Sequence, residues 1–386
     1  MKNQIKTQAT VTGLKIKTST VLLAATLIAM ITPSAATAGP KSDRHGGAAV
    51  LRDDEHGGRI KNQKGGRAKG HKGEARHHRE EHTATLLVTG LGGSQGSTVG
   101  PDGALYVTEN LEGRIWRVDP ETGQVTTFAS GLPAGLFGIG NGGVVDVAFI
   151  GKTAYALVTG VASDSGGTNV VGIYRVDGPA SFTVVADIGE FNLLNPPTHV
   201  FQIDVPTGYQ YALQTYHDGF LVTDGHLNRV LRVTLDGEIT ELIAFDNIVP
   251  TGLAVSGDTI YMAEGGPDPH LPQTGKVVSF GPKSPTATEV ASGAPWLLDV
   301  EFGGGGRLYA LSFGTFDPLT ELENLAVPDT GALVKVNGDG TLTVVMDGLN
   351  QPTSLEFIGN KAYVVTLTGE IWTIDGVSGP PYGPAR

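Results

Sequence analysis

Cysteine is absent from all 386 residues of the chain. Its absence excludes disulfide bonds, thiolate zinc sites and a cysteine nucleophile. The sequence also has no G-x-S-x-G nucleophile elbow, no G-x-x-x-x-G-K-[ST] phosphate loop and no dinucleotide-binding fingerprint. The glycine run at residues 303–306 indicates a turn within a hairpin. No motif therefore assigns a specific reaction to this chain.

Hydrophobic runs of membrane length are also missing. The apolar run at residues 21–31 is about eleven residues long, whereas a bilayer requires roughly 20 helical positions. Four lysines and no acidic residue precede this run, and residues 36–38 form an A-x-A cleavage site. We therefore predict a secretory signal peptide over residues 1–38, cleaved after Ala38. The protein is expected to be secreted or extracytoplasmic, without membrane insertion.

Basic residues are scarce in most of the mature chain. Residues 83–386 have 12 Lys and Arg against 32 Asp and Glu, whereas residues 39–82 have 11 Lys and Arg against 7 acids. This Gly-, Lys- and His-rich segment has little to bury, so it predicts a disordered basic linker, and its six histidines fit either a transition-metal site or a solvated segment. The acidic remainder argues against nucleic acid as a partner and favours cations or cationic partners.

Repeated segments organise residues 83–376. Each repeat has short apolar runs with alternating or β-branched residues, separated by Gly, Asn or Asp turns, which is typical of one blade of an antiparallel β-propeller. Six copies align on the end of their second strand, and the residues there are Glu109, Val158, Asp224, Glu264, Ser312 and Thr366. The sequence therefore predicts an all-β protein with the fold of a six-bladed β-propeller.

The fourth strand of a blade is found in only five of the six repeats. The apolar segment at residues 85–91 has the character of the missing strand, so we expect the N-terminal strand to close the last blade. Such closure removes exposed sheet edges and replaces disulfides as the link between the two ends of the domain. The ring is expected to be monomeric, with residues 377–386 as a C-terminal tail.

Carboxylates recur at the second-strand ends, at Glu109, Asp224 and Glu264, and Asp299 follows an apolar run early in a later blade. Equivalent positions of different blades converge on a channel mouth, and calcium binds six to eight oxygen ligands. These four residues are therefore candidate ligands for calcium or another divalent cation. The alternative is that each carboxylate accepts hydrogen bonds from the backbone of its own turn. Other acids occur early in the blades, at Asp146 and Glu356.

Two histidines follow strand-end acids, His226 after Asp224 and His270 after Glu264. Either could act as a general acid or base near neutral pH, which makes both candidate catalytic residues. A solvated loop histidine is the simpler interpretation. Three overlong segments, residues 160–168, 191–214 and 313–330, are expected to form a rim around one mouth of the channel or to be decoration without function.

The chain resembles exported bacterial propellers of the NHL-like group, and in particular the ScyD/ScyE family. The phrases VGPDGALYVTE at residues 99–109, GRIWRVDP at 113–120 and TFASGLP at 127–133 carry this resemblance, which covers about residues 83–376. It implies a secreted six-bladed propeller, often of unassigned activity, and defines no catalytic residues. By fold, the chain is also similar to the calcium-dependent gluconolactonase group and to the streptogramin B lyase group, whose chemistry depends on a metal in the channel.

Three functions are compatible with these features. The first is binding of a small-molecule ligand or a protein partner at one face of the propeller, without catalysis. The second is a hydrolase, lactonase or lyase that depends on a divalent cation, in which the acids would hold the metal and His226 or His270 would move a proton. The third is a scaffold of the cell envelope that binds through the basic linker.

Overall fold

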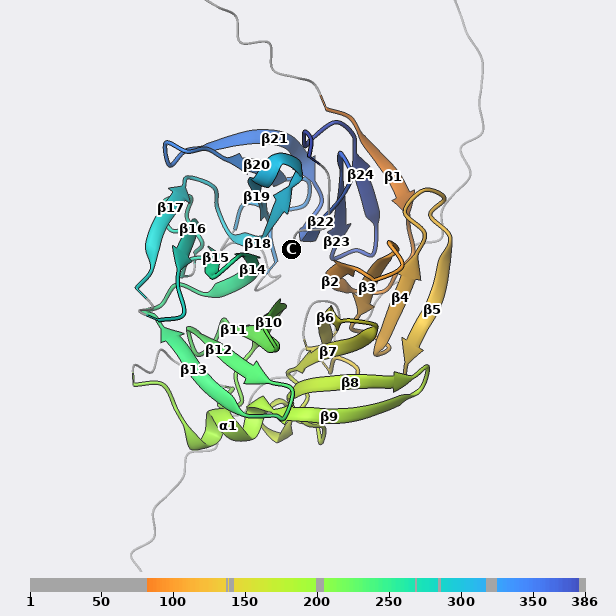
Figure 1. Ribbon diagram of the computed structural model, residues 1–386, viewed down its shortest axis with the longest axis vertical. Coiled ribbons are helices and arrows are strands. Elements are labelled where there is room, and N and C mark those ends of the chain that lie inside the picture. Colours follow the sequence, from red (N-terminus) through yellow and green to blue (C-terminus); the bar gives the residue numbers. More distant parts are fainter. Residues whose placement is uncertain are drawn as a thin grey trace, which may run out of the picture. The chain divides into compact units, whose positions relative to one another are not determined.

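The computed structural model describes residues 82–136, 138, 142–198, 205–267, 269–283, 286–316 and 325–381. The predicted signal peptide and nearly all of the predicted basic linker lie outside these residues. The described part forms six four-stranded antiparallel sheets arranged in a ring, which confirms the predicted six-bladed propeller (Figure 1). No helix in the described residues has the length and apolar character that a membrane span requires.

Each blade contributes one strand to each of four concentric positions. The inner strands, next to the axis, are β2 (Ser94–Val99), β6 (Gly143–Ile150), β10 (Gln210–Tyr216), β14 (Pro250–Ser256), β18 (Leu297–Gly303) and β22 (Pro352–Ile358). The second strands are β3 (Leu105–Glu109), β7 (Thr153–Thr159), β11 (Gly219–Asp224), β15 (Thr259–Glu264), β19 (Arg307–Ser312) and β23 (Lys361–Thr366). The third strands are β4 (Arg114–Val118), β8 (Gly172–Gly178), β12 (Arg229–Thr234), β16 (Lys276–Phe280), β20 (Gly331–Val336) and β24 (Ile371–Ile374). The outer strands are β5 (Val125–Ser130), β9 (Ser181–Asp187), β13 (Ile239–Ala244), β17 (Thr288–Ser292), β21 (Leu342–Leu349) and β1 (Ala84–Val88).

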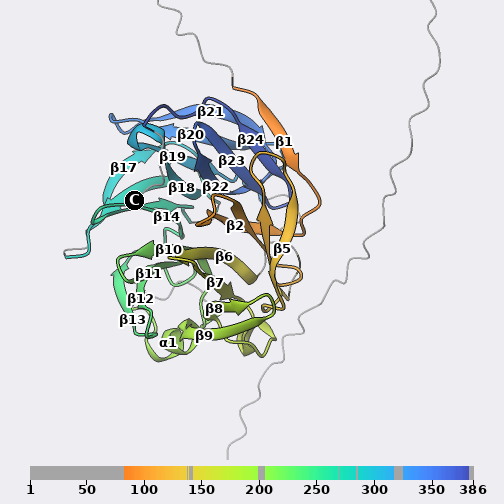
Figure 2. The same ribbon diagram turned by 45° about the vertical axis from the view of Figure 1, so that its right-hand side comes forward.

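The N-terminal strand closes the ring as predicted. β1 pairs antiparallel with β24, so the sixth blade combines the two ends of the domain (Figure 2). Val88 is buried, and Leu91, just beyond the strand, packs in the same apolar cluster as residues of blades one and six. This closure covers the edge that β24 would otherwise expose.

Apolar side chains between neighbouring blades form the core. Second-strand residues alternate between the two faces of their sheet, and both faces are covered by an adjacent blade, so these strands are buried almost throughout. The helix α1 (Ile188–Leu194) lies in the connection between blades two and three (Figure 1). Asp187 caps it by accepting a hydrogen bond from the Glu190 amide at 2.7 Å.

Candidate functional site

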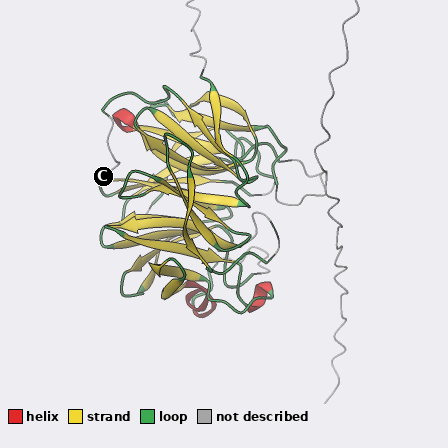
Figure 3. Cartoon of the chain, turned by 90° about the vertical axis from the view of Figure 1, so that its right-hand side faces the viewer, coloured by secondary structure: helices red, strands yellow, loops and turns green. Residues whose placement is uncertain are grey.

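One end of the ring collects the long connections. The second strands end where the inner strands begin, as the pairs Ser94 with Glu109 and Gln210 with Asp224 show. The described parts of the three overlong segments leave from this end, which we call the loop mouth. Figure 3 shows the ring from the side. Asp164 links two of the segments, because its carboxylate accepts hydrogen bonds from the Thr207 amide at 2.9 Å and the Thr207 hydroxyl at 2.7 Å.

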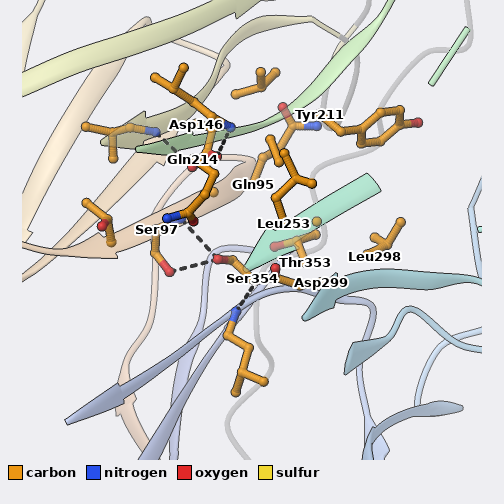
Figure 4. Close-up of a pocket in the computed structure, with 18 of the residues that line it drawn as sticks. Gln95, Ser97, Asp146, Tyr211, Gln214, Leu253, Leu298, Asp299, Thr353 and Ser354 are labelled. Carbon is orange, nitrogen blue, oxygen red and sulfur yellow. Dashed lines mark hydrogen bonds between the residues drawn. The ribbon is translucent and has the colours of Figure 1, made fainter. Parts of the chain in front are cut away.

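A cavity, which we call the axial pocket, lies on the axis of the ring. Residues of the inner strands of all six blades line it (Figure 4). The space open to the centres of water molecules is about 110 Å³, which is enough for several waters or a small molecule. Four carboxyl groups line the pocket or its wall, from Asp146, Asp299, Glu301 and Glu356. Tyr211 also lines the pocket, but its ring points away from Asp146 and Asp299 (Figure 4) and lies against Gly225.

Asp146 and Asp299 connect neighbouring blades through backbone amides. Asp146 accepts hydrogen bonds from Val147 N in its own strand at 2.8 Å and from Leu213 N in the next blade at 2.7 Å. Asp299 repeats this arrangement three blades further on, with Val300 N at 2.8 Å and Leu355 N at 2.8 Å. Each carboxylate therefore satisfies two amides on the inner edges of two blades.

The residues at the same strand position in other blades fit this arrangement. Ser354 uses its hydroxyl to accept from Ser97 N in blade one at 3.1 Å. Gly96 and Gly252 occupy this position in the blades just before those of Asp146 and Asp299. A Cβ added at Gly96 would lie 2.3 Å from the carboxylate of Asp146, and one added at Gly252 would lie 2.4 Å from that of Asp299. The absence of a side chain at these two glycines thus leaves room for the aspartates.

Burial perturbs the acids of the axial pocket. It raises the pKa of Asp146 to about 8 and that of Asp299 to about 7, while their backbone hydrogen bonds act in the opposite direction. Burial and the neighbouring Asp299 raise the pKa of Glu301 to about 8. The pKa of Glu356 is raised well above its ordinary range by burial and then by Glu301 and the two aspartates. Glu301 and Glu356 thus behave as a coupled pair that holds protons near neutral pH.

The structure places Asp224 in a fully buried network away from the other candidate ligands. Its Oδ2 accepts from Asn192 Nδ2 at 2.8 Å and Gln210 Nε2 at 2.7 Å, and its Oδ1 accepts from Tyr209 N at 3.2 Å and Leu227 N at 3.0 Å. Four donors occupy its oxygens, which favours the structural alternative for this carboxylate.

Glu109 and Glu264 remain in their own blades. Glu109 accepts a hydrogen bond from Gly92 N at 3.1 Å, and Arg114 lies 3.7 Å from its other oxygen. Burial raises the pKa of Glu264 to about 7, and Lys276 opposes this shift. Asp299 is grouped with the acids of the axial pocket instead. No three His, Asp or Glu side chains of the described residues are arranged to hold a metal ion. The assignment of these four residues as ligands stays a prediction.

The two candidate catalytic histidines have different surroundings. His226 is exposed at the loop mouth, where its ring centroid is 5.6 Å from that of Tyr209. His270 is buried, stacked on Trp296 with ring centroids 4.1 Å apart, and its Nδ1 is 3.1 Å from Gly265 O. A catalytic role for either histidine stays a prediction.

Sequence reasoning did not identify Glu301 and Gln214 as pocket-lining residues or recognise the amide-binding role of Asp146 and Asp299. One signal of this role is present in the sequence. At the same position of the inner strand, a Gly in one blade is followed by an Asp in the next, first as Gly96 and Asp146 and again three blades later as Gly252 and Asp299.

The chain is thus a six-bladed β-propeller with a polar pocket on its axis. No protein-family model matches it, and no curated protein matches its sequence. Solved structures match its fold. A gluconolactonase from Xanthomonas campestris superposes with a TM-score of 0.53 at 13% identity, over 77% of this chain and 90% of that protein. A putative oxidoreductase (glucose dehydrogenase) from Thermus thermophilus superposes with a TM-score of 0.52 at 17% identity, over 76% of this chain and 100% of that protein. A virginiamycin B lyase from Staphylococcus aureus superposes with a TM-score of 0.47 at 13% identity, over 76% of this chain and 99% of that protein. At such identities, the first two of these matches show the fold alone.

Proposed function

We propose that this protein is an extracytoplasmic propeller of the ScyD/ScyE kind that binds a small ligand in the axial pocket. The observation that carries the proposal is the cavity itself. Residues from all six inner strands converge on it, and it has room for a small molecule. Ligand sites in ring-shaped folds commonly lie where equivalent strands converge, because each blade can contribute one contact.

The lining defines the chemistry of the ligand. The carboxyl groups of Glu301 and Glu356 offer acceptors, and the domain as a whole has 32 acids against 12 basic residues. Such a field concentrates cations and repels anions. We therefore expect a small cationic or neutral ligand that is rich in N–H or O–H donors.

Thermal unfolding with matched six-carbon probes tests this proposal. The probes are hexylamine and glucamine as cations, and hexanoate and gluconate as the corresponding anions, each at roughly tens of millimolar and at about pH 8.5, above the pKa of about 8 for Glu301. A ligand specific to the native state raises its apparent melting temperature. We expect both amines to raise it and both anions to leave it unchanged, with the shift reduced in Glu356→Gln. Equal shifts with amines and anions, or no shift with any probe, would contradict the proposal.

A second candidate function adds hydrolysis of a bound lactone or a lyase reaction. Glu301, with a pKa of about 8, has the protonation behaviour of a general acid near neutral pH. A structure with the same fold is described as a gluconolactonase. Hydrolysis of glucono-δ-lactone, measured with EDTA and with added calcium, separates the two candidates. A rate above background that Glu301→Gln abolishes would favour catalysis, whereas a rate equal to background would leave binding alone.

A further inference from the structure

Six backbone amides point toward the axis at one level of the ring. Hairpins of two residues join the inner and second strands of several blades, for example through Gly257 and Asp258 in blade four. Because paired residues of antiparallel strands alternate between bonded and non-bonded pairs, Leu253 opposite Met262 falls at a non-bonded pair. Its N–H therefore points away from the second strand, as that of Leu213 does. The amides in this register are those of Ser97, Val147, Leu213, Leu253, Val300 and Leu355.

Side-chain oxygens accept five of these six hydrogen bonds. Asp146 and Asp299 accept two each, and Ser354 accepts the fifth. The exception is Leu253 in blade four. The position that supplies the acceptor to the following blade is occupied there by Ala212, which has no oxygen in its side chain. Within the described residues, no side chain accepts a hydrogen bond from the Leu253 amide.

This amide belongs to the axial pocket. Ala212 and Leu253 both line the cavity, together with Glu301 and Glu356, and Figure 4 shows where Leu253 lies. A backbone N–H without a protein acceptor is costly in a buried place, so it is normally paired with water or a ligand. The ring of acceptors is thus interrupted at one place, and that place borders a cavity that could hold the missing acceptor.

We propose that the Leu253 amide is the hydrogen-bond donor that selects the ligand, and that the ligand carries a hydroxyl or carbonyl acceptor beside its own donors. This inference rests on the proposed function and narrows the ligand to polyhydroxylated molecules, with amino polyols as the chemistry that fits best. Their hydroxyl groups accept from Leu253, while their O–H and N–H groups donate to Glu301 and Glu356.

Glucamine and hexylamine both carry an ammonium group, but only glucamine has hydroxyl groups. Comparing them therefore tests the hydrogen bond to the Leu253 amide separately from the binding of a cation. We expect glucamine to bind more tightly than hexylamine by about 3- to 10-fold, the range of a single hydrogen bond. In Ala212→Ser, the new hydroxyl takes the place that Ser354 has in blade six and accepts the hydrogen bond from the Leu253 amide. The affinity of this variant for glucamine should fall to that for hexylamine, and its affinity for hexylamine should not change. Ala212→Val, which adds volume without an acceptor, controls for the size of the side chain.

Amide hydrogen exchange of the unaltered full chain, resolved by NMR, gives a readout that does not depend on a variant folding. The Leu253 amide should exchange faster than the five paired amides and should slow when glucamine, but not hexylamine, is added. A Leu253 amide that is equally protected without any probe, or that is insensitive to glucamine, would overturn this inference. Equal binding of both amines that Ala212→Ser leaves unchanged would also overturn it, while the proposed function would stand. Failure of both amines to bind would remove the proposed function and this inference together.

Discussion

The coupled acids of the axial pocket predict that the ring loses stability as the pH rises. A carboxyl group whose pKa is higher in the folded state than in the unfolded chain binds more protons when folded. Its favourable contribution is complete below pH 4 and is lost as the pH rises through the folded pKa, which is about 8 for Glu301. We therefore expect the free energy of unfolding to fall between pH 5 and pH 9.

The variant Glu356→Gln tests this directly, because it removes one charge from the pair and keeps the shape of the side chain. Burial, and then the charges of Glu301 and the two aspartates, raise the pKa of Glu356 well above its ordinary range, so the fold opposes its ionisation at pH 9. Each pKa unit of such a shift corresponds to about 1.36 kcal/mol of stability. Water in the pocket reduces this, and we expect the variant to recover about 2 kcal/mol at pH 9. At roughly 2 °C per kcal/mol for a domain of this size, the apparent melting temperature should rise by about 4 °C.

Differential scanning calorimetry at pH 5 and pH 9 measures the effect. At pH 5, Glu356 is protonated, so the variant and the original protein should unfold at the same temperature. Glu121→Gln, in an exposed turn of blade one, is the matched control and should change neither value. A variant that is less stable at pH 9, or that shifts equally at both pH values, would contradict a cost that arises from ionising the buried Glu356.

Three further predictions concern the loop mouth. Asp224→Ala leaves four donors without their acceptor and should lower the free energy of unfolding in urea by about 3 kcal/mol or more. Asp218→Ala, at an exposed ion pair, should lower it by less than about 1 kcal/mol, and equal losses would contradict the role of the network around Asp224. Arg229→Met removes the bonds to Asn192 Oδ1 and Asn195 O that fix α1, so chymotrypsin should cleave faster after the exposed Leu194, and an unchanged rate would refute this role. Calcium added after EDTA should leave the apparent melting temperature within about 1 °C, because the oxygens of Asp224 are already bonded; a rise of several degrees would support the metal interpretation.

The fold could be predicted from the sequence because every blade repeats the same local pattern. The expected second-strand ends at Glu109, Asp224 and Glu264 coincide with the ends of β3, β11 and β15. The missing outer strand was assigned correctly by counting, since a closed ring needs as many outer strands as blades, and β1 takes that place. Periodicity and turn residues are local signals, so one sequence contains them.

The contacts of the candidate site depend on neighbouring blades and were not predictable in this way. The oxygens of Asp146 bind an amide 67 residues away, at Leu213, and no local pattern reports that distance. Two of the donors to Asp224 come from the long insertion before blade three, from Asn192 and from the Tyr209 amide. Convergence of the strand-end acids was expected from their equivalent positions. Equivalent positions fix the level of a residue in the ring, whereas its partners decide the direction of its side chain.

The acids of the axial pocket connect stability and binding, and this link makes a last prediction. At pH 5, the pair formed by Glu301 and Glu356 is protonated, so a bound cation gains little and relieves no repulsion. Near pH 8.5, Glu301 is above its pKa of about 8, so the pair carries negative charge, and an amine with a pKa near that of lysine remains charged. The stabilisation by hexylamine should therefore grow between pH 5 and pH 8.5, and Glu356→Gln should flatten this dependence. An increase in apparent melting temperature that is the same at both pH values would show that the amine binds outside the axial pocket.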